Sequence, residues 1–521
     1  MEQERRSVRL ARPVKKGLLR LVFSRIPLVA LLFVLQMLIL LTLYFWVKRY
    51  VPHFTAAQTV FAIVMIVYLF NNRMDSSAKL TWMWIISLAP IPGTIFLFFT
   101  QRNWGHRTTK KRTEQVIAET KNELEQEESV LASLEKDGSG TDDLARYLRR
   151  SGCFPVYERT AADYFPSGEA KFAAMIEELE KAQHFIFLEY FIIEEGEMWG
   201  EILDILIRKA QAGLDVRVMY DGMCEINQLP DNYHKLLRAK GIKTKVFSPI
   251  APIVSSHYNY RDHRKILVID GQVAMTGGVN LADEYINKVE RFGHWKDAAL
   301  RLRGPAVRSF TLMFLQMWNL DEKNADYSAC HVPVKAVPSP GYVIPYGDSP
   351  LDEDKVGETV YMDILNRATD YVHIMTPYLI LDGELETSLK YAAERGVDVK
   401  LILPGIPDKK TAFALAKTHY RVLTEAGVRI YEYTPGFIHA KVCVSDAQKA
   451  VVGTINLDYR SLYHHFECAA YLYKTDCIAD TEQDFQETLA KCREVTAESI
   501  REEKLFYKVL GGILKFIAPL L

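Results

Sequence analysis

The sequence lacks paired cysteines and an excess of charge of either sign. Its seven cysteines are scattered along 521 residues, and none forms the C-x2-C spacing of a zinc or redox site. An odd, dispersed set also argues against disulfides, so we expect small buried thiols in a reducing compartment. The formal net charge is −1, which gives no overall positive field to attract nucleic acid.

We also expect no cleavable signal peptide, because the first apolar segment is too long and has no small-residue cleavage site. Residues 26–47 carry no charge over 22 positions, enough to cross about 30 Å of hydrocarbon. The segment 55–70 is shorter, and 80–99 is again long enough unless Pro90-Ile91-Pro92-Gly93 breaks it into a hairpin. We therefore expect a transmembrane helical region of two or three helices at 26–100.

Basic residues flank this apolar region on both sides. They lie in the tail 1–25 and in the segment after residue 99, and the positive-inside rule places both in the cytoplasm. An even number of crossings would satisfy that rule, whereas three apolar segments are present, so the number of crossings stays open. Residues 101–145 are rich in Lys, Glu and Gln and read as a charged helical linker exposed to solvent.

One short motif occurs twice in the rest of the chain. Imidazole can attack phosphorus or move a proton near neutral pH, and lysine attracts phosphate oxygens. A single copy would be ordinary on a solvated edge strand, but the repetition indicates a phosphoryl-transfer site built from two halves. Each copy has a histidine, a lysine, an aspartate and an asparagine at fixed spacing: His263, Lys265, Asp270 and Asn280, then His439, Lys441, Asp446 and Asn456.

The surroundings of the motif predict an α/β fold made of two similar halves. Each copy runs into apolar β-branched residues, so we expect a strand on which histidine and lysine share a face. Strand-like runs alternate with helical ones such as 170–181 and 385–395. Three further phrases recur in the same order: HFIFLEYFII (184–193) with YVHIMTPYLI (371–380), GLDVRVMYDG (213–222) with GVDVKLILPG (396–405), and GIKTKVFSP (241–249) with GVRIYEYTP (427–435).

We expect residues 146–330 and 331–500 to be these halves, packed into one catalytic unit that shares a site. Two domains with independent sites are the alternative, but one motif alone does not supply both a nucleophile and an acid.

The paired motif resembles that of the phospholipase D superfamily, and the phrases around it are similar to those of bacterial cardiolipin synthases. The similarity extends from about residue 59 to residue 521. The phrases that carry it are Tyr220-Asp221-Gly222, Gly277-Gly278-Val279-Asn280, Thr376-Pro377-Tyr378, Leu403-Pro404-Gly405, Gly436-Phe437-Ile438-His439 and Asn456-Leu457-Asp458-Tyr459-Arg460-Ser461.

The resemblance implies roles for the motif residues. His263 would attack the phosphate and form a phosphohistidine, and His439 would protonate the leaving alcohol, although the reverse assignment stays open. The two lysines, with Asn280 and Asn456, would hold the phosphate oxygens. Asp270 and Asp446, counted with the catalytic set, follow the strands and would shape the site rather than touch phosphate.

Each catalytic imidazole also needs an acceptor to orient it. By similarity to the family we assign Glu467 to His439 and Asp297 to His263. The family often has Asn where this chain has His465. Adjacent histidines point apart on a strand, so we expect His465 at the surface or the rim of the site.

The resemblance implies a membrane-bound cardiolipin synthase that transfers a phosphatidyl group between two phosphatidylglycerol molecules and releases glycerol. We expect it in a bacterial cell membrane, multi-pass, with the catalytic region cytoplasmic. No metal, no cofactor and no nucleic acid partner is expected, and the oligomeric state is open. The alternatives are a hydrolytic phospholipase D, a phosphatidyltransferase that uses another alcohol, and a membrane scaffold with an inactive site.

The last segment, residues 501–521, combines lysines with a broad apolar face. This pattern is typical of helices that lie in the plane of a membrane surface. Docking against the protein's own fold explains the same pattern equally well.

Overall fold

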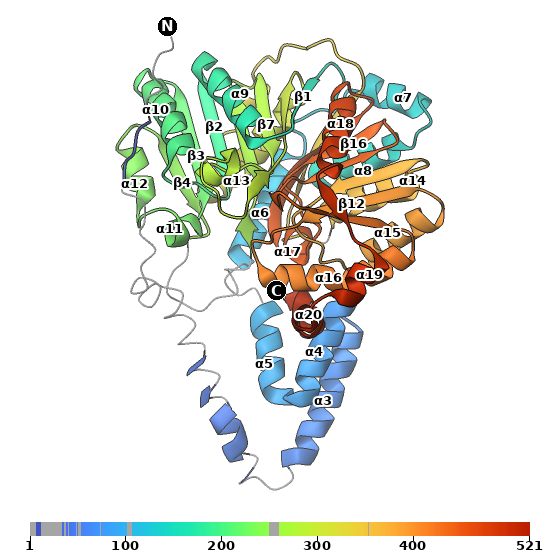
Figure 1. Ribbon diagram of the computed structural model, residues 1–521. Helices are drawn as coiled ribbons and strands as arrows, with labels where there is room; N and C mark the ends of the chain where they lie inside the picture. Colours follow the sequence, from blue (N-terminus) through green and yellow to red (C-terminus); the bar gives the residue numbers. More distant parts are fainter. Residues whose placement is uncertain are drawn as a thin grey trace.

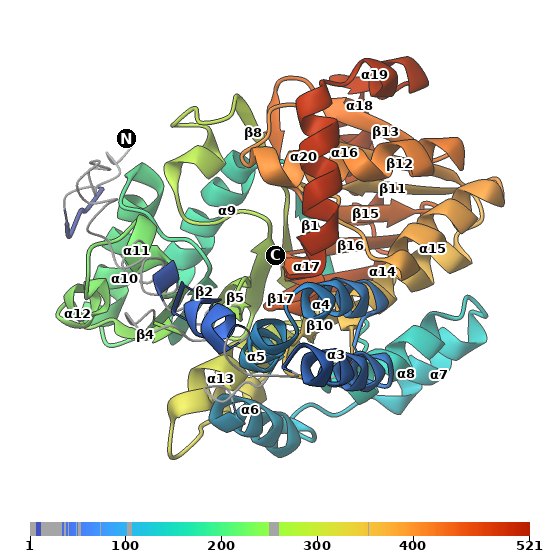
Figure 2. The ribbon, with the colours of Figure 1, turned by 90° about the horizontal axis from the view of Figure 1, so that it is seen from below.

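The computed structural model describes residues 7–11, 34–35, 38–39, 41–47, 49, 54–72, 74–101, 107–249, 260–352 and 354–520 of the chain. Two β-sheets with helices on their faces form the body of the molecule, and the helices of residues 54–101 extend from one end of it (Figure 1). Seen from that end, the two sheets lie side by side (Figure 2).

The first half is a seven-stranded mixed sheet of order β1-β9-β7-β6-β2-β3-β4. The pairs β2–β3 and β3–β4 are parallel, and the other pairs are antiparallel. The strands are β1 (Ala161–Phe165), β2 (Phe185–Tyr190), β3 (Asp215–Asp221), β4 (Lys243–Phe247), β6 (Lys265–Ile269), β7 (Val273–Gly277) and β9 (Ala299–Arg303).

The second half repeats this topology strand for strand, in the order β10-β17-β16-β15-β11-β12-β13, with β18 added at one edge. The directions of the pairs also match. The expected α/β fold of two similar halves is therefore confirmed. The strands are β10 (Tyr342–Asp348), β11 (Tyr371–Met375), β12 (Asp398–Pro404), β13 (Arg429–Tyr433), β15 (Val442–Ser445), β16 (Lys449–Gly453), β17 (His465–Tyr473) and β18 (Cys492–Glu494).

Helices cover the faces of both sheets, so the central strands are buried on both sides and read as continuous apolar runs. One helix, α13 (Val307–Trp318), is buried along its whole length because it packs against β6 and β7 of one sheet and β10 of the other. The other helices of the two halves are α9 (Gly168–Lys181), α10 (Glu197–Gln211), α11 (Cys224–Asn227), α12 (Tyr233–Arg238), α14 (Val356–Arg367), α15 (Gly383–Glu394), α16 (Lys410–Glu425), α17 (Tyr459–Tyr463) and α18 (Cys477–Leu489).

Two short strands tie the halves together. The strand β5 (Arg261–Asp262) of the first half pairs in parallel with the start of β17, and β8 (His294–Lys296) pairs in parallel with β14 (Gly436–Ile438) of the second half. A buried ion pair reinforces this junction, because Lys296 Nζ lies 2.7 Å from Asp484 Oδ2. The hydroxyl of Tyr164 donates to the same carboxylate at 2.6 Å.

The described part of the linker region 101–145 contains helices, but it is not a solvated spacer. It contains α6 (Arg107–Thr120) and α7 (Glu128–Lys136) and runs into α8 (Thr141–Gly152). Val130 and Leu134 of α7 belong to the main core. The sparse apolar residues of this segment thus fall on one helical face and pack against the body.

The three helices that extend from the body are α3 (Phe54–Phe70), α4 (Ser76–Leu88) and α5 (Pro90–Gln101). The break expected at Pro90 is confirmed, because α4 ends at Leu88 and Pro90 opens α5. The segment 80–99 therefore forms parts of two short helices and not one long one. Half of the segment 26–47 lies outside the described residues, and within the described part of the chain no helix combines the length and the hydropathy of a membrane span.

Removing the carboxylate at the junction should destabilise the protein strongly. Asp484→Ala leaves the Lys296 ammonium buried and unpaired, which we expect to cost about 3–5 kcal/mol of unfolding free energy in chemical denaturation. The control is Glu425→Ala, which removes the exposed Arg421–Glu425 pair and should cost less than about 1 kcal/mol. Equal effects of the two variants would mean that apolar packing alone holds the halves together.

Candidate active site

The two motifs meet where the halves join. The strands β6 and β15 begin at Lys265 and Val442, so the expected strands form, but His263, His439 and Lys441 lie just before them and not on them. His263 and His439 are 6% and 8% exposed, and both motif lysines are buried. Lys441 and His439 both contribute to lowering the pKa of His263, so the two motifs occupy one site.

Each histidine is oriented by a carboxylate from the opposite half. His263 Nδ1 lies 2.8 Å from Glu467 Oε1, and His439 Nδ1 lies 2.8 Å from Asp297 Oδ2. The two acids are the ones predicted, but the assignment of Glu467 to His439 and of Asp297 to His263 is wrong.

The inter-half strand pairs explain the exchange. Pairing of β5 with β17 places the backbone N–H of His263 3.0 Å from the carbonyl of Phe466, the residue before Glu467. Pairing of β8 with β14 places the N–H of His439 2.6 Å from the carbonyl of Lys296, the residue before Asp297. Each histidine is therefore fixed through its backbone and its ring by the partner half.

The two carboxylates differ in their electrostatics. Burial raises the pKa of Glu467 well above its ordinary value, although Lys265 and a hydrogen bond from Thr454 oppose this. Burial also acts on Asp297, but there the charge and hydrogen bond of His439, with Lys441, outweigh it and lower the pKa. The site thus pairs His439 with an ionised carboxylate, whereas the Glu467 carboxyl shares a hydrogen bond with His263.

Burial favours the neutral form of both imidazoles. Burial lowers the pKa of His263 well below its ordinary value and that of His439 to about 4, and the neighbouring Lys265 and Lys441 add to the effect. A bound anion would oppose these lysines and favour an imidazolium.

The lysines are held by the carbonyls of the histidines that precede them. Lys265 Nζ donates to the carbonyl of His263 at 2.6 Å, and Lys441 donates in the same way to His439. Burial lowers the pKa of Lys265 to about 8 and that of Lys441 to about 7. A third buried lysine, Lys171 of α9, contributes to the same field, and its pKa is lowered to about 7.

Sequence reasoning missed Lys171, because a single lysine in an amphipathic helix carries no signal of burial. Its ammonium donates to the carbonyl of Val279 at 3.0 Å and to the hydroxyl of Tyr190 at 3.2 Å. Val279 directly precedes Asn280, so Lys171 supports the segment that follows the first motif.

The two asparagines lie in the buried site, with different partners. Asn280 Oδ1 accepts from the N–H of Ile192 at 3.0 Å, and its Nδ2 donates to Tyr285 at 2.8 Å. Asn456 Oδ1 is buried and has no hydrogen-bond partner among the described residues, so it is an acceptor free to receive a hydroxyl group.

The motif aspartates stand at the far ends of their strands. The carboxylate of Asp270 accepts the backbone N–H groups of residues 183–185 at 2.7–2.8 Å, and Asp446 accepts those of residues 369–371 at 2.9 Å. The strands β6, of five residues, and β15, of four, separate each aspartate from its histidine by at least about 13 Å. Counting Asp270 and Asp446 as catalytic is therefore corrected: they fix the entry of β2 and β11 into the sheets.

Aromatic rings flank each imidazole in equivalent places. Trp295, two residues before Asp297, lies 5.3 Å from the ring of His439, and His465, two residues before Glu467, lies 5.3 Å from that of His263. Phe191 closes the site around His263 at 5.0 Å, and Tyr285 that around His439 at 5.5 Å.

The expectation that His465 lies at the surface or the rim is wrong, since it is buried beside the reacting histidine. Neither of its ring nitrogens makes a hydrogen bond to a described residue. Its Nδ1 lies 3.7 Å from Glu467 Oε1.

His263, His465 and Glu467 have the donor types of a metal site, with ligand atoms within 4.8 Å of one another. The hydrogen bond between His263 and Glu467 and the nearby charge of Lys265 oppose a cation there, so the donor set fits proton transfer better.

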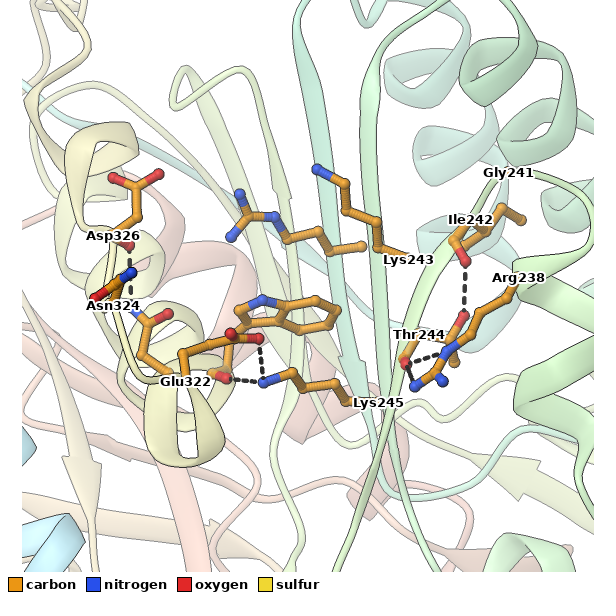
Figure 3. A pocket seen from close by; sticks show the side chains of 12 residues that line it. Arg238, Gly241, Ile242, Lys243, Thr244, Lys245, Glu322, Asn324 and Asp326 are labelled. Atoms are coloured by element: carbon orange, nitrogen blue, oxygen red, sulfur yellow. Dashed lines mark hydrogen bonds and ion pairs between the residues drawn. The ribbon is translucent and has the colours of Figure 1, made fainter.

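A separate pocket of about 530 Å³ lies at the β4 edge of the first sheet (Figure 3). Four basic side chains line it, but their groups are engaged with the protein: Lys245 pairs with Glu322, Arg217 and Lys243 with Asp215, and Arg238 donates to the carbonyl of Thr244. None of the predicted site residues lines this pocket.

The chain is similar in sequence to a known family and to proteins of several bacteria. A family model described as "Cardiolipin synthase, PLD-like domain" matches residues 175–318 and 361–489. The chain is 33% identical to cardiolipin synthase 2 of Bacillus anthracis over 470 residues, which cover 89% of this chain and 90% of that protein. It is 56% identical over 457 residues to an uncharacterized protein of Streptococcus mutans, covering 88% of this chain and 99% of that protein.

Among solved structures, a phosphatidylserine synthase from Haemophilus influenzae matches with a TM-score of 0.53 and 16% identity. The match covers 69% of this chain and 93% of that chain. At this identity it concerns the fold alone.

Binding of a phosphate-like anion should take up protons near neutral pH. With a pKa of about 7, the Lys441 ammonium is less than half protonated at pH 7.5 in the empty site, and an adjacent anion raises that pKa. We expect calorimetry with sulfate in buffers of different ionisation enthalpy to report proton uptake, and Lys441→Met to reduce it. The exposed Lys323→Met is the control, and heats that do not depend on the buffer would show that the lysines are already charged.

Proposed function

Because the chain belongs to the cardiolipin synthase family with phospholipase D-like domains, we propose that it joins two phosphatidylglycerol molecules into cardiolipin and releases glycerol. Membership of this family makes the chain an enzyme of the phosphatidyltransferase type. The observation that carries the proposal is the pair of crossed histidine–carboxylate contacts beside two buried lysines in one site.

In the first step, Nε2 of neutral His263 attacks the phosphorus of the donor lipid. The bond from phosphorus to the glycerol headgroup oxygen breaks, and His439 gives its proton to that oxygen. In this proposal a carboxyl oxygen of Glu467 accepts the Nδ1–H of His263, so the lone pair of Nε2 faces the phosphate. Lys265 and Lys441, with Asn280 and Asn456, are proposed to bind the phosphate oxygens as charge moves onto them.

In the second step, His439 removes a proton from a glycerol hydroxyl of the second phosphatidylglycerol. That oxygen attacks phosphorus, and the phosphorus–nitrogen bond to His263 breaks. One phosphodiester replaces another, so the reaction needs no nucleotide.

The electrostatics favour His439 as the residue that carries the proton. Its partner Asp297 is ionised and stabilises an imidazolium, as the carboxylate of a catalytic triad does. The pKa of His439 is about 4 in the empty site, so the negative phosphodiester must supply the rest of the stabilisation. With substrate bound, His439 therefore keeps the proton that it gives to the leaving oxygen.

Water must be a poor competitor for the phosphohistidine. Both histidines are buried, and the rings of Phe191, Tyr285 and Trp295 surround them. A dry site of this kind favours transfer to a lipid alcohol over hydrolysis.

We propose further that residues 26–100 hold the protein in a bacterial cell membrane, multi-pass, with the catalytic unit on the cytoplasmic side. The exterior of α3 supports this placement, because Val60, Ile63, Val64 and Val67 are each more than half exposed. Basic residues on both sides of the region support the orientation.

The product assay decides the reaction. Purified protein in phosphatidylglycerol micelles should yield cardiolipin and glycerol by mass spectrometry, and His263→Ala and His439→Ala should each lower the rate by about 10³-fold or more. His373→Gln is the matched control, because His373 is also buried and bound to a carboxylate, Glu482, outside the site. Phosphatidic acid without cardiolipin would make the enzyme a hydrolase, and no turnover of any phospholipid would support an inactive scaffold.

The crossed carboxylates should matter for turnover more than for binding. Glu467→Gln and Asp297→Asn keep size and hydrogen bonding but remove the group that fixes the imidazole tautomer, so we expect kcat to fall about 10²–10⁴-fold with little change in KM. Asp446→Asn is the contrast, because it acts at the far end of β15 and should lower stability rather than kcat. Wild-type kcat in both carboxylate variants would contradict these roles.

A further inference from the structure

The C-terminal helix α20 (Leu505–Ile517) presents two distinct faces. One face packs on α16, and the approach is close at Gly511, where a Cβ atom would lie 2.4 Å from the carbonyl oxygen of Ala414. The other face leaves large apolar side chains in the open, with exposures of 41–74%: Leu505, Phe506, Val509, Ile513 and Phe516. The sequence left two explanations for this segment, docking on the protein and an apolar face for a membrane surface. The helix α20 has both a docked face and an exposed apolar face.

The exposed side chains form a continuous stripe with a basic border. Because successive helical residues are about 100° apart, the five apolar residues fall within about 100° of arc. Lys504, Lys508 and Lys515 fall together on one flank of that stripe, and all three are exposed. From residue 504 to the end of the chain there is no acidic residue.

The stripe continues onto the helices that extend from the body. Thr81 of α4 donates its hydroxyl to the carbonyl of Phe516 at 2.7 Å, and the ring of Phe516 meets Trp84 edge-on, with 6.3 Å between centroids. Trp84 is 58% exposed, so the apolar surface of α4 joins that of α20.

The orientation of α20 differs from that of its neighbours. In Figure 1, α3 and α4 run lengthwise away from the body, and α20 is seen end-on where they leave it. In Figure 2, α20 lies across the view, and α3 and α4 are foreshortened. A membrane that surrounds α3 and α4 would therefore have α20 lying along its surface.

The helix α20 also contacts the second half, close to the candidate active site. Leu514 and Ala518 pack in a cluster with Leu415 and Tyr459, and Tyr459 stands three residues after Asn456. Lipid contact along α20 would thus be transmitted to the segment that carries a predicted phosphate ligand.

We propose that α20 lies in the plane of an anionic bilayer surface, with its apolar stripe among the acyl chains and its lysine flank at the phosphate headgroups. This inference rests on the proposed membrane placement of α3 and α4. An anionic surface fits both the lysine flank and the charge of the proposed substrate. The helix then fixes the height of the second half above the lipid from which substrate enters.

The test uses the full chain in vesicles of phosphatidylglycerol and phosphatidylcholine, with an environment-sensitive fluorophore on a single introduced cysteine. Six native cysteines are buried. Cys492 is partly buried, and burial raises the pKa of its thiol. The unsubstituted protein therefore serves as the control for labelling of native cysteines. The probe positions are Ile513→Cys on the stripe, Val64→Cys on α3, and Ala479→Cys on the exposed face of α18 as the control.

The expected result is quenching of the probe at 513 by lipids that carry a shallow spin label, quenching at 64 by a deep label, and none at 479. Quenching at 64 alone would overturn the proposal and leave the membrane placement intact. Quenching at neither position would reject the membrane placement itself. A probe at 513 that is shielded but not quenched by lipid, with a dimer in solution, would assign the stripe to a second copy of the chain.

A second measurement separates lipid contact from damage to the site. Val509→Glu with Ile513→Glu should lower the rate on phosphatidylglycerol vesicles at least about fivefold, but change the rate on a short-chain, dispersed substrate by less than about twofold. Lys504, Lys508 and Lys515 changed together to Gln should weaken shallow quenching at 513 when the vesicles contain phosphatidylglycerol. Equal losses on both substrates, or unchanged quenching in the triple variant, would overturn the role of the stripe or of its lysine flank.

Discussion

The crossed hydrogen bonds between the histidines and the carboxylates are the constraint on which the rest of the site depends. An imidazole next to phosphate needs a fixed tautomer and a fixed direction, and here both come from the opposite half. The same junction contains the short strand pairs β5–β17 and β8–β14 and the buried ion pair between Lys296 and Asp484. Neither half alone contains a complete histidine–carboxylate unit, so the folding of the junction and the formation of the site are one event.

Burial lowers the pKa values of the histidines and lysines around the proposed phosphate position. It makes both imidazoles neutral and leaves Lys441 and Lys171 poised near neutrality. An incoming phosphodiester restores charge to these groups, so the interactions strengthen as the substrate arrives. The lysines therefore repel one another little without an anion beside them. Their attraction for phosphate oxygens increases when a phosphodiester binds and raises their pKa values.

The duplicated topology and the residues of the motif could be predicted from sequence because both are local patterns. Strand periodicity placed His263 beside Lys265, and repetition of short phrases revealed two similar halves. The exchange of Glu467 and Asp297 could not be predicted, because it depends on strand pairs that join segments more than 130 residues apart. The burial of His465 was missed for a related reason, because nothing in the neighbouring sequence says that the other half will cover it. Lys171 is buried within its own half, against Tyr190 and the carbonyl of Val279, which are distant in sequence.

The reciprocal exchange has the form of an isologous contact, in which residue i of one copy meets residue j of the other and j meets i. A two-fold homodimer of single halves would make the same two contacts, with identical acids and identical flanking rings. In a single chain that contains both halves, the two acids and the two flanking rings can differ. One side here carries Asp297 and Trp295, and the other carries Glu467 and His465. In one chain the surroundings of the two histidines can therefore differ, as the proposed division between a nucleophile and a proton carrier requires.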